Sequence, residues 1–412
     1  MSGDPPSTRI APPAALASGA AGAVLAALPG ARAVGGLVRD LLAGRPLADI
    51  DVAAPFPPET IAERLRAAGL RVFETGLAHG TVTAVLDREP VEVTALRQDI
   101  ATDGRHAEVA WTTDWRIDAA RRDFTINAMS LAADGRLWDY FGGRADLAAG
   151  RVRFVGDPAT RLAEDFLRAL RFFRFQARYG RGTPDPAAIA AIAAAVPGLA
   201  RLSAERVWSE LKRLLIAPDP CDALALMAAC GVLGAVLPEV TEANTIPRLP
   251  RLRRLVAITP STDPVLRLAA LLGEVLPRGL GGLAGRLRMS GEERGRLSRY
   301  CGHRHDPRPD PGLDHDAARR LLALYGAAEA QAELLLAEAE DGQDRAADRA
   351  LLAATPVPVF PLLGQDVLDL GVPEGPRIGR LYNSVRGWWF AGGCVADKDA
   401  LLARMREEVA AG

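Results

Sequence analysis

AVGGLVRDLLAGRPLADIDV, residues 33–52, is the most informative stretch of this sequence. Its pattern predicts a strand, a Gly-Gly turn, a helix and a second strand that carries Asp49 and Asp51. Residues i and i+2 of a strand point to the same side, so we expect the two aspartates to project together while Ile50 and Val52 face a core. Adjacent carboxylates repel each other unless a cation lies between them, and their hard oxygen atoms suit Mg²⁺. The second strand is therefore a candidate magnesium site.

The Gly-Gly turn adds a candidate site for an anion. Gly35 and Gly36 lack side chains and precede a helix, so a phosphate can approach the backbone N–H groups at the helix N-terminus. Arg39 follows three residues after Gly36, within reach of the same anion. Either feature alone is commonly a plain turn or solvated charge. Together, a metal pair and a phosphate site within one stretch indicate phosphoryl or nucleotidyl transfer.

The same stretch closely resembles the GGxVRD…DxD motif of class II tRNA nucleotidyltransferases and bacterial poly(A) polymerases, in the polymerase-β-like superfamily. The resemblance implies an α+β fold with a small mixed-sheet nucleotidyltransferase head, followed by an all-helical neck, body and tail. We expect the head at residues 1–155, the neck with a base-reading helix at 156–245, the helical body at 246–354 and an RNA-binding tail at 355–412.

Composition limits where such a protein works and what it binds. The net charge is −1, so an RNA partner needs a locally basic groove and not a global positive field. Four scattered cysteines without CxxC spacing argue against disulfides or zinc and favour a reducing cytoplasm. No segment has the length of a membrane span, and the Ala-rich residues 16–28 favour a packed helix over a signal peptide. No obligate protein partner is evident.

The remainder of the head predicts strands and loops around this stretch. Residues 1–12 predict a loose tail, and residues 13–28 one helix. Two alternating segments, 81–86 and 91–96, predict paired strands. Glu92 on the second of them is either a third carboxylate near the metals or a solvent-facing residue, and the sequence favours neither. Residues 98–120 predict a mobile loop, in which Asp103-Gly104-Arg105 resembles the flexible-loop motif of enzymes that add all three nucleotides.

A second motif of the same family occurs at residues 121–131, RRDFTINAMSL. The pattern predicts a helix that turns Phe124 inward, with Asp123 as its cap. The segment resembles the RRDxTxNA motif. That resemblance implies that Arg122 contacts the nucleotide triphosphate, while Asp123 and Asn127 order the site or contact the ribose.

The run RLAEDFLRALRFFRFQARYG, residues 161–180, predicts a helix with an ordered row of charges. A plain amphipathic helix with i,i+3 ion pairs would look similar. The run also matches the EDxLRxLRxxRF motif, which reads the incoming base in the family. Cytosine and adenine carry an exocyclic amine, which Asp165 can accept, next to a ring nitrogen, to which Arg168 can donate. Uracil and guanine present a carbonyl instead, so this pair favours C and A. Arg171 and Arg174 assist by holding phosphates or the helix.

The helical remainder carries weaker signals. Ser203 predicts an N-cap in a segment that resembles the neck of the family. The basic run 248–254, RLPRLRR, either meets RNA phosphates or forms a solvated face. His315–Asp316 and a similar pair before it lie in a predicted loop, which argues against a metal-dependent hydrolase of the His-Asp type. Residues 360–385 resemble the family's C-terminal motif, where the tail meets the body of tRNA, and Trp388 and its neighbour favour packing over base stacking.

The combined interpretation is an enzyme, a class II CCA-adding tRNA nucleotidyltransferase. The resemblance implies addition of C, C and A to the tRNA 3′ end from CTP and ATP by two-Mg²⁺ chemistry at Asp49 and Asp51. The triphosphate would lie against Gly36, Arg39 and Arg122. A poly(A) polymerase or a partial CC-adding or A-adding enzyme of the same scaffold remains an alternative. A non-catalytic RNA-binding relative is a further class, in which degraded carboxylates would be expected.

Overall fold

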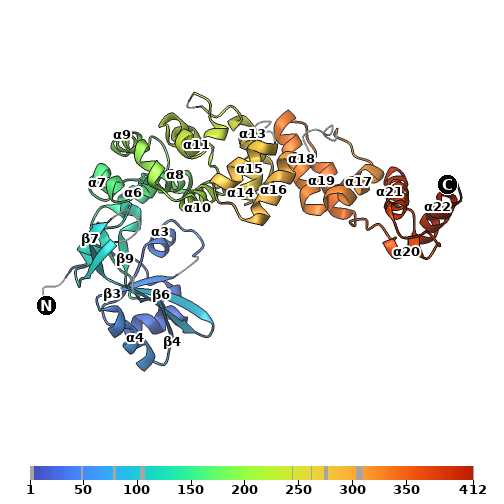
Figure 1. Cartoon of the computed structure of the whole chain (residues 1–412). Coiled ribbons are helices and arrows are strands. Elements are labelled where there is room, and N and C mark those ends of the chain that lie inside the picture. The colour runs from blue at the N-terminus through green and yellow to red at the C-terminus, as the bar shows by residue number, and fades with distance from the viewer. Residues whose placement is uncertain are drawn as a thin grey trace. The chain divides into compact units, whose positions relative to one another are not determined.

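The chain folds into two compact units, residues 1–245 and 246–412 (Figure 1). The structure is a computed structural model. It describes residues 4–47, 50–77, 80–102, 107–243, 245–260, 262–272, 277–302 and 310–411. The predictions for Asp49, for the Asp103-Gly104-Arg105 motif and for the His-Asp pair at His305–Asp306 lie outside the described residues.

The first unit begins with a mixed eight-stranded sheet in the order β1-β10-β9-β2-β3-β6-β5-β4. Strands β3 and β6 are parallel and the other paired neighbours antiparallel, so the predicted mixed sheet is confirmed, although with more strands than the sequence indicated. The strands are β1 (Thr8–Arg9), β2 (Arg32–Val34), β3 (Asp51–Ala54), β4 (Arg71–Gly76), β5 (Thr81–Leu86), β6 (Glu89–Ala95), β9 (Met129–Leu131) and β10 (Arg136–Asp139).

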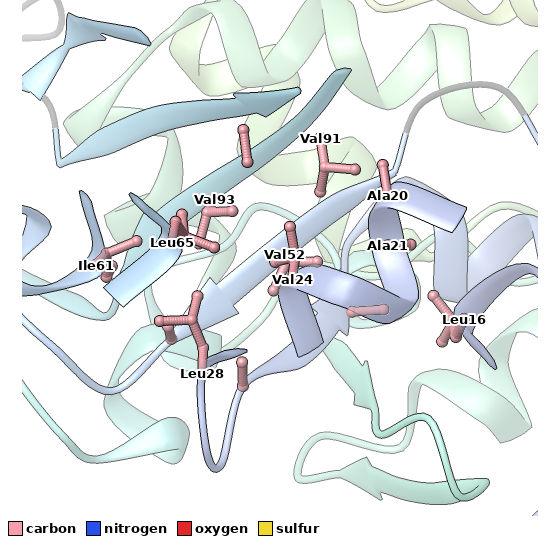
Figure 2. Packing of buried hydrophobic residues seen from close by; sticks show 14 of the residues in the cluster. Leu16, Ala20, Ala21, Val24, Leu28, Val52, Ile61, Leu65, Val91 and Val93 are labelled. Carbon is pink, nitrogen blue, oxygen red and sulfur yellow. The ribbon is translucent and has the colours of Figure 1, made fainter. Parts of the chain in front are cut away.

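The main core lies between this sheet and the helices α1 (Ala14–Ala17), α2 (Gly19–Ala27) and α4 (Pro58–Ala67). Figure 2 shows Val24 of α2 and Leu65 of α4 near Val52 and Val93 of the sheet, and all four are fully buried. Each such side chain contributes about 1.5–3 kcal/mol on burial. Val52 and the partly buried Ile50 pack in this core, which confirms the predicted inward face of the strand.

Two predictions for the N-terminal region were wrong. The single helix over 13–28 is broken, because Ser18 is extended and Gly19 has a φ of +64°. A residue of left-handed conformation cannot continue an α-helix. The described part of the predicted loose tail, residues 4–12, is also ordered: β1 pairs with β10, and the Asp4 carboxylate accepts from Arg32 at 2.9 Å.

Two further segments differ from the sequence predictions. The described residues of 98–120 are not one loop: strands β7 (Arg97–Thr102) and β8 (Ala107–Trp111) pair antiparallel, followed by α5 (Trp115–Ala120). The predicted helix after Asp123 is only one 3-10 turn, η2 (Thr125–Asn127), because the next residues pair as β9 inside the sheet. Phe124 is fully buried, as predicted.

The helical part of the first unit is joined to the head by a cluster of aromatic rings in tilted and edge-on contact. Phe124 lies 4.9 Å from Phe154 and 5.2 Å from Phe175 of α8, between ring centroids. Helices α8 and α10 pack against each other (Figure 1). The elements are α3 (Gly36–Leu42), α6 (Gly143–Ala149), α7 (Pro158–Glu164), α8 (Leu167–Tyr179), α9 (Pro186–Ala195), η3 (Val196–Arg201), α10 (Ala204–Leu215), α11 (Cys221–Ala229), α12 (Val232–Val236) and η4 (Pro238–Val240). Ser203 occupies the N-cap position of α10, as predicted, although its side chain makes no cap hydrogen bond.

The second unit is helical throughout its described residues. Its helices are α13 (Leu249–Ile258), α14 (Pro264–Leu271), α15 (Pro277–Arg286), α16 (Gly291–Gly302), α17 (His315–Tyr325), α18 (Ala327–Asp341), α19 (Ala346–Ala354), α20 (Gly364–Leu368), α21 (Pro376–Ala391) and α22 (Lys398–Ala410). None of the described helices in either unit is long and apolar enough to cross a membrane.

In the second unit two predictions were wrong, and the two residues of a third prediction differ in their surroundings. His315–Asp316 begins α17 and does not lie in a loop. The basic run 248–254 is neither solvated nor free for RNA throughout, because Arg248, Arg251 and Arg254 contact α18. The two tail tryptophans differ: Trp389 is buried in the local core, whereas Trp388 is 43% exposed.

Candidate active site

The carboxylate strand is held in place by the sheet on both sides. Val52 lies in the main core, so the side chain of Asp51 projects from the opposite face of β3. The parallel pairing with β6 places Glu92 directly beside Asp51. Glu92 is exposed, and side chains paired in register lie on the same face of the sheet. The described residues thus bring two carboxylates together, Asp51 and Glu92.

The Gly-Gly turn brings two guanidinium groups to the start of α3. Gly35 has a φ of +65°, a conformation that favours glycine, and a Cβ there would lie 3.2 Å from an Arg122 guanidinium nitrogen. A Cβ on Gly36 would lie 3.5 Å from a guanidinium nitrogen of Arg39. The two glycines therefore allow both arginines to approach the main chain closely.

Arg39 and Arg122 differ in how closely their guanidinium groups are hydrogen-bonded. Arg39 is 9% exposed and donates to Asn127 Oδ1 at 2.6 Å and to the Asp40 carboxylate at 2.9 Å. Tyr179 also donates to Asp40, at 2.5 Å, and its ring lies 4.5 Å from the Arg39 guanidinium. The contacts of Arg122 are longer, 3.3 Å to Asp118 and 3.5 Å to the Asn127 carbonyl. Arg39 is fixed in the wall, whereas Arg122 is the easier of the two to redirect.

A continuous chain of hydrogen bonds connects the head to α8. Asn127 accepts from Arg39 and donates to Asp123 Oδ1 at 2.9 Å. The other oxygen of Asp123 accepts from Arg171 Nε at 2.7 Å and from a terminal nitrogen at 2.5 Å. Both bonds are charge-assisted, and charge-assisted bonds are stronger than those between neutral groups. Burial raises the pKa of Asp123, but Arg171 and the Asn127 amide outweigh it and hold the pKa below its usual value.

The segment predicted to read the base, residues 161–180, is interrupted at Asp165. Residues 161–180 form two helices, because Asp165 is extended and its carboxylate accepts from the backbone N–H of Leu167 at 3.1 Å. The second Asp165 oxygen accepts from Arg206 of α10 at 2.6 Å. The uninterrupted helix predicted from the sequence was therefore wrong, and the break turns Asp165 toward α10.

Arg168 lies one turn further along and is held by three partners. Its guanidinium pairs with Glu164 and donates to the backbone carbonyls of Arg161 at 3.0 Å and Arg121 at 3.2 Å. The contact with Arg121 ties α8 to α5 of the head. Asp165 and Arg168 thus have fixed positions on the same wall.

Arg174 is anchored by a buried acid that the sequence analysis did not single out as its partner. Glu210 of α10 is 4% exposed and accepts from Arg174 Nε at 2.7 Å, with Arg171 at 3.8 Å and Arg213 at 3.5 Å. Burial lowers the pKa of Arg174. The signal for this role was present, because Glu210 falls among the inward-facing apolar positions of α10, where an acid needs a partner.

These side chains meet in one cavity of about 850 Å³ within the first unit. Eight of the nine predicted site residues line it, and the ninth, Asp49, lies outside the described residues. The eight are Gly36, Arg39, Asp51, Arg122, Asp165, Arg168, Arg171 and Arg174. Tyr179 and Arg206 also line it and were not predicted as site residues, because their positions depend on the packing of α3, α8 and α10.

The carboxylates fit a hard divalent cation. Magnesium is commonly held by one or two carboxylates together with substrate phosphates and water. Asp51 lies at the cavity with Glu92 beside it, and arginines suited to phosphate line the same cavity. Among the described residues no cluster of three or more His, Cys, Asp or Glu forms a complete metal cage. The donor set therefore suits a cation that is shared with a phosphorylated ligand.

The geometry defines a nucleotidyltransferase-like head joined to a helical neck, and comparison with known proteins agrees. The poly(A) polymerase head domain matches residues 31–153, and a second family described as a probable RNA- and SrmB-binding site of polymerase A matches residues 183–244. The matched segments include the carboxylate strand in the first case and α10 in the second.

Relatives match over nearly the full chain. A mitochondrial CCA tRNA nucleotidyltransferase 1 from Danio rerio is 35% identical over 91% of this chain and 87% of its own length. The Homo sapiens protein of the same name is 36% identical over 91% and 86%. A crystal structure of the Bacillus stearothermophilus CCA-adding enzyme in complex with CTP is 25% identical, with a TM-score of 0.73 over 92% and 93% of the two chains. This chain belongs to the family of CCA-adding tRNA nucleotidyltransferases.

Proposed function

We propose that this protein adds C, C and A to the 3′ end of tRNA, with CTP and ATP as substrates and Mg²⁺ as cofactor. The observation that carries the proposal is the convergence of Asp51, Arg122, Asp165 and Arg168 on one cavity. The relatives' names and the CTP complex of the bacterial enzyme support the choice of substrates.

The metal-facing side of the cavity performs the transfer. Asp49 and Asp51 would hold the Mg²⁺ ions, which supply a lowered pKa for the RNA 3′-hydroxyl and neutralise the leaving pyrophosphate. Gly36 leaves room for the triphosphate beside Arg39. Arg122, with its longer contacts, turns toward the phosphates, while Arg39 keeps the wall in shape. Glu92 lies beside Asp51 and can add a third carboxylate.

The α8 side of the cavity selects the base. A carboxylate offers about four acceptor positions. Asp165 has accepted from Leu167 and Arg206, so it retains capacity for the exocyclic amine of cytosine or adenine. Arg168 donates to the neighbouring ring nitrogen. Arg171 and Arg174 hold α8 against the head and α10 through Asp123 and Glu210, which keeps the reading pair in place at the cavity.

We propose a cytoplasmic location, because all four cysteines are free thiols. The Danio and Homo sapiens relatives carry mitochondrial names. A fluorescent fusion in the source cells tests the location directly.

The activity is tested by incubating the protein with tRNA that lacks its CCA end and with labelled CTP, ATP, UTP or GTP. We expect two C residues and one A, with addition stopping after the third nucleotide. Long A tracts would make the protein a poly(A) polymerase, and products that stop at CC or need a CC primer would make it a partial enzyme. Binding of tRNA without any nucleotide addition would show that the protein is a non-catalytic RNA-binding relative.

A further inference from the structure

A second, basic cavity of about 460 Å³ lies in the first unit, and no role has yet been given to it. It is formed by the C-terminal ends of α3 and α8 and by α6. Its cationic residues are Arg45, Arg144, Arg178 and Arg181, with Tyr179 between them. Arg178 and Tyr179 also line the main cavity, so the basic cavity adjoins the proposed nucleotide site.

These four arginines differ in their partners from Arg168, Arg171 and Arg174, which pair with acids. Arg45 donates to the Arg178 carbonyl at 2.6 Å, and Arg181 donates to the Ala148 carbonyl at 2.6 Å. Within the described part of the chain, no carboxylate forms an ion pair with any of the four. A guanidinium has five N–H donors, and one bond to a carbonyl leaves its charge uncompensated. The cavity is therefore suited to an anionic ligand.

The backbone is shaped to bring Arg181 into this position. Gly150, just after α6, has a φ of +69°, and a Cβ there would lie 2.6 Å from the Cβ of Arg181. Its carbonyl accepts from the Arg181 backbone N–H at 2.7 Å. Glycine thus permits a contact that fixes Arg181 against the end of α6.

Stabilisation of helix ends does not account for all four charges. Arg45, Arg178 and Arg181 lie near helix C-termini, where cations are favourable. Arg144 lies in the first turn of α6, where a cation is unfavourable. Its side chain is exposed, and only its backbone N–H is used, by the Asp139 carboxylate at 2.9 Å. A ligand with negative charge explains its presence in the cavity.

We propose that the basic cavity binds backbone phosphates of the RNA strand whose 3′ end enters the main cavity. The inference rests on the proposed function, because that function brings an RNA end to the adjoining site. Phosphate contacts by arginine supply sequence-independent, salt-sensitive affinity and position a strand without reading its bases. Such a hold suits an enzyme that extends one RNA through successive additions.

The test is the full-length double variant Arg144→Ala/Arg181→Ala, compared with wild type in fluorescence anisotropy with tRNA lacking CCA. We expect the Kd for tRNA to rise about tenfold. The plot of the logarithm of the association constant against the logarithm of the salt concentration is expected to become less steep by roughly 1.4–1.8, as for two lost phosphate contacts. The KM for CTP and kcat at saturating tRNA are expected to remain at the wild-type values. The double variant Arg144→Lys/Arg181→Lys restores much of the affinity, since it keeps both charges.

The matched control is Arg66→Ala/Arg71→Ala, which removes the same charge at the far β4 side of the sheet and leaves tRNA binding unchanged. Unchanged tRNA affinity and salt slope in the cavity variant overturn the inference. The inference is also overturned if inorganic pyrophosphate inhibits the cavity variant less than wild type while tRNA binding is unaltered. That result would assign the cavity to a free phosphate ligand. If the double variant unfolds, Arg144→Ala alone gives the same comparison. Nucleotide addition by wild type, measured alongside, separates failure of this inference from failure of the proposed function.

Discussion

Helices α8 and α13 are both rich in arginine, yet their arginines have different surroundings. On α8, Arg168, Arg171 and Arg174 are paired with acids and also line a cavity of about 850 Å³. On α13, Arg251 is 3% exposed and lies 3.0 Å from Glu340, and Arg254 donates to two carbonyls of α18. A dense basic run therefore does not by itself indicate a binding surface. The distinction lies in whether the paired charges border open space or close a helix–helix contact.

The largest effect is expected at the carboxylate strand that faces the α8 wall. Asp51→Asn removes a charged ligand for the metal while keeping the side chain's shape. We expect the rate of CMP addition to fall about a thousandfold or more, roughly 4 kcal/mol of barrier. Single-turnover assays measure it. Glu59→Gln, an exposed acid on α4, is the control and keeps the wild-type rate; a near-normal rate for Asp51→Asn would reject the metal assignment.

The next largest effect concerns the bond that holds α8 to the head. Asp123→Asn breaks the buried pair with Arg171 and is expected to lower the free energy of unfolding by about 3 kcal/mol at neutral pH. Because the pKa of folded Asp123 is lowered, its ionised form stabilises the fold above the unfolded pKa of about 3.9. That contribution is lost as the pH falls through the folded pKa.

Urea unfolding of wild type and Asp123→Asn across pH 2–7 measures this difference. The two proteins converge in stability at the acid end of the range. The exposed Asp134→Asn changes stability by less than about 0.5 kcal/mol at every pH and serves as the control. Equal stability of Asp123→Asn and wild type at neutral pH would show that the Asp123–Arg171 pair does not hold α8.

The third effect is smaller and concerns the choice of base, not the overall rate. Arg168→Ala removes the donor of the reading pair, so the preference for CTP over UTP is expected to fall about 10- to 100-fold, in line with 1–3 kcal/mol for one base contact. The ratio of kcat/KM for the two nucleotides measures it. An unchanged ratio would exclude Arg168 from base reading.

The smallest effect is expected for the arginines of α13, which close a contact with another helix. Arg254→Ala loses hydrogen bonds to α18 and is expected to reduce stability by about 1 kcal/mol, with tRNA affinity and nucleotide preference unchanged. Arg254→Lys keeps the charge but not the paired geometry. If the alanine variant loses tRNA affinity and the lysine variant regains it without a change in stability, the basic run binds RNA after all.

The sequence predicted the local chemistry of the site because spacing along one strand or helix is a local property. The face of Asp51 on its strand and the row of Arg168, Arg171 and Arg174 on α8 depend only on the periods of strand and helix. These residues converge on one cavity, although their roles remain predictions.

What the sequence analysis missed depends on contacts between distant segments. The break at Asp165 reflects Arg206, 41 residues away, and the stretch after Asp123 becomes a strand because the sheet supplies its partners. The N-terminal residues are ordered by Arg32 and β10. The arginines of α13 are occupied by α18, about 90 residues further on. None of these pairings leaves a periodic signal in its own segment.

The central claim is that the strand bearing Asp51 binds a divalent cation beside the α8 wall. Titration of the full-length protein with Mn²⁺, followed by electron paramagnetic resonance of the free ion, tests it without reference to activity. The account predicts that wild type and Arg254→Ala bind Mn²⁺ alike, and that Asp51→Asn binds it at least about tenfold more weakly. Equal binding by Asp51→Asn and wild type would contradict it.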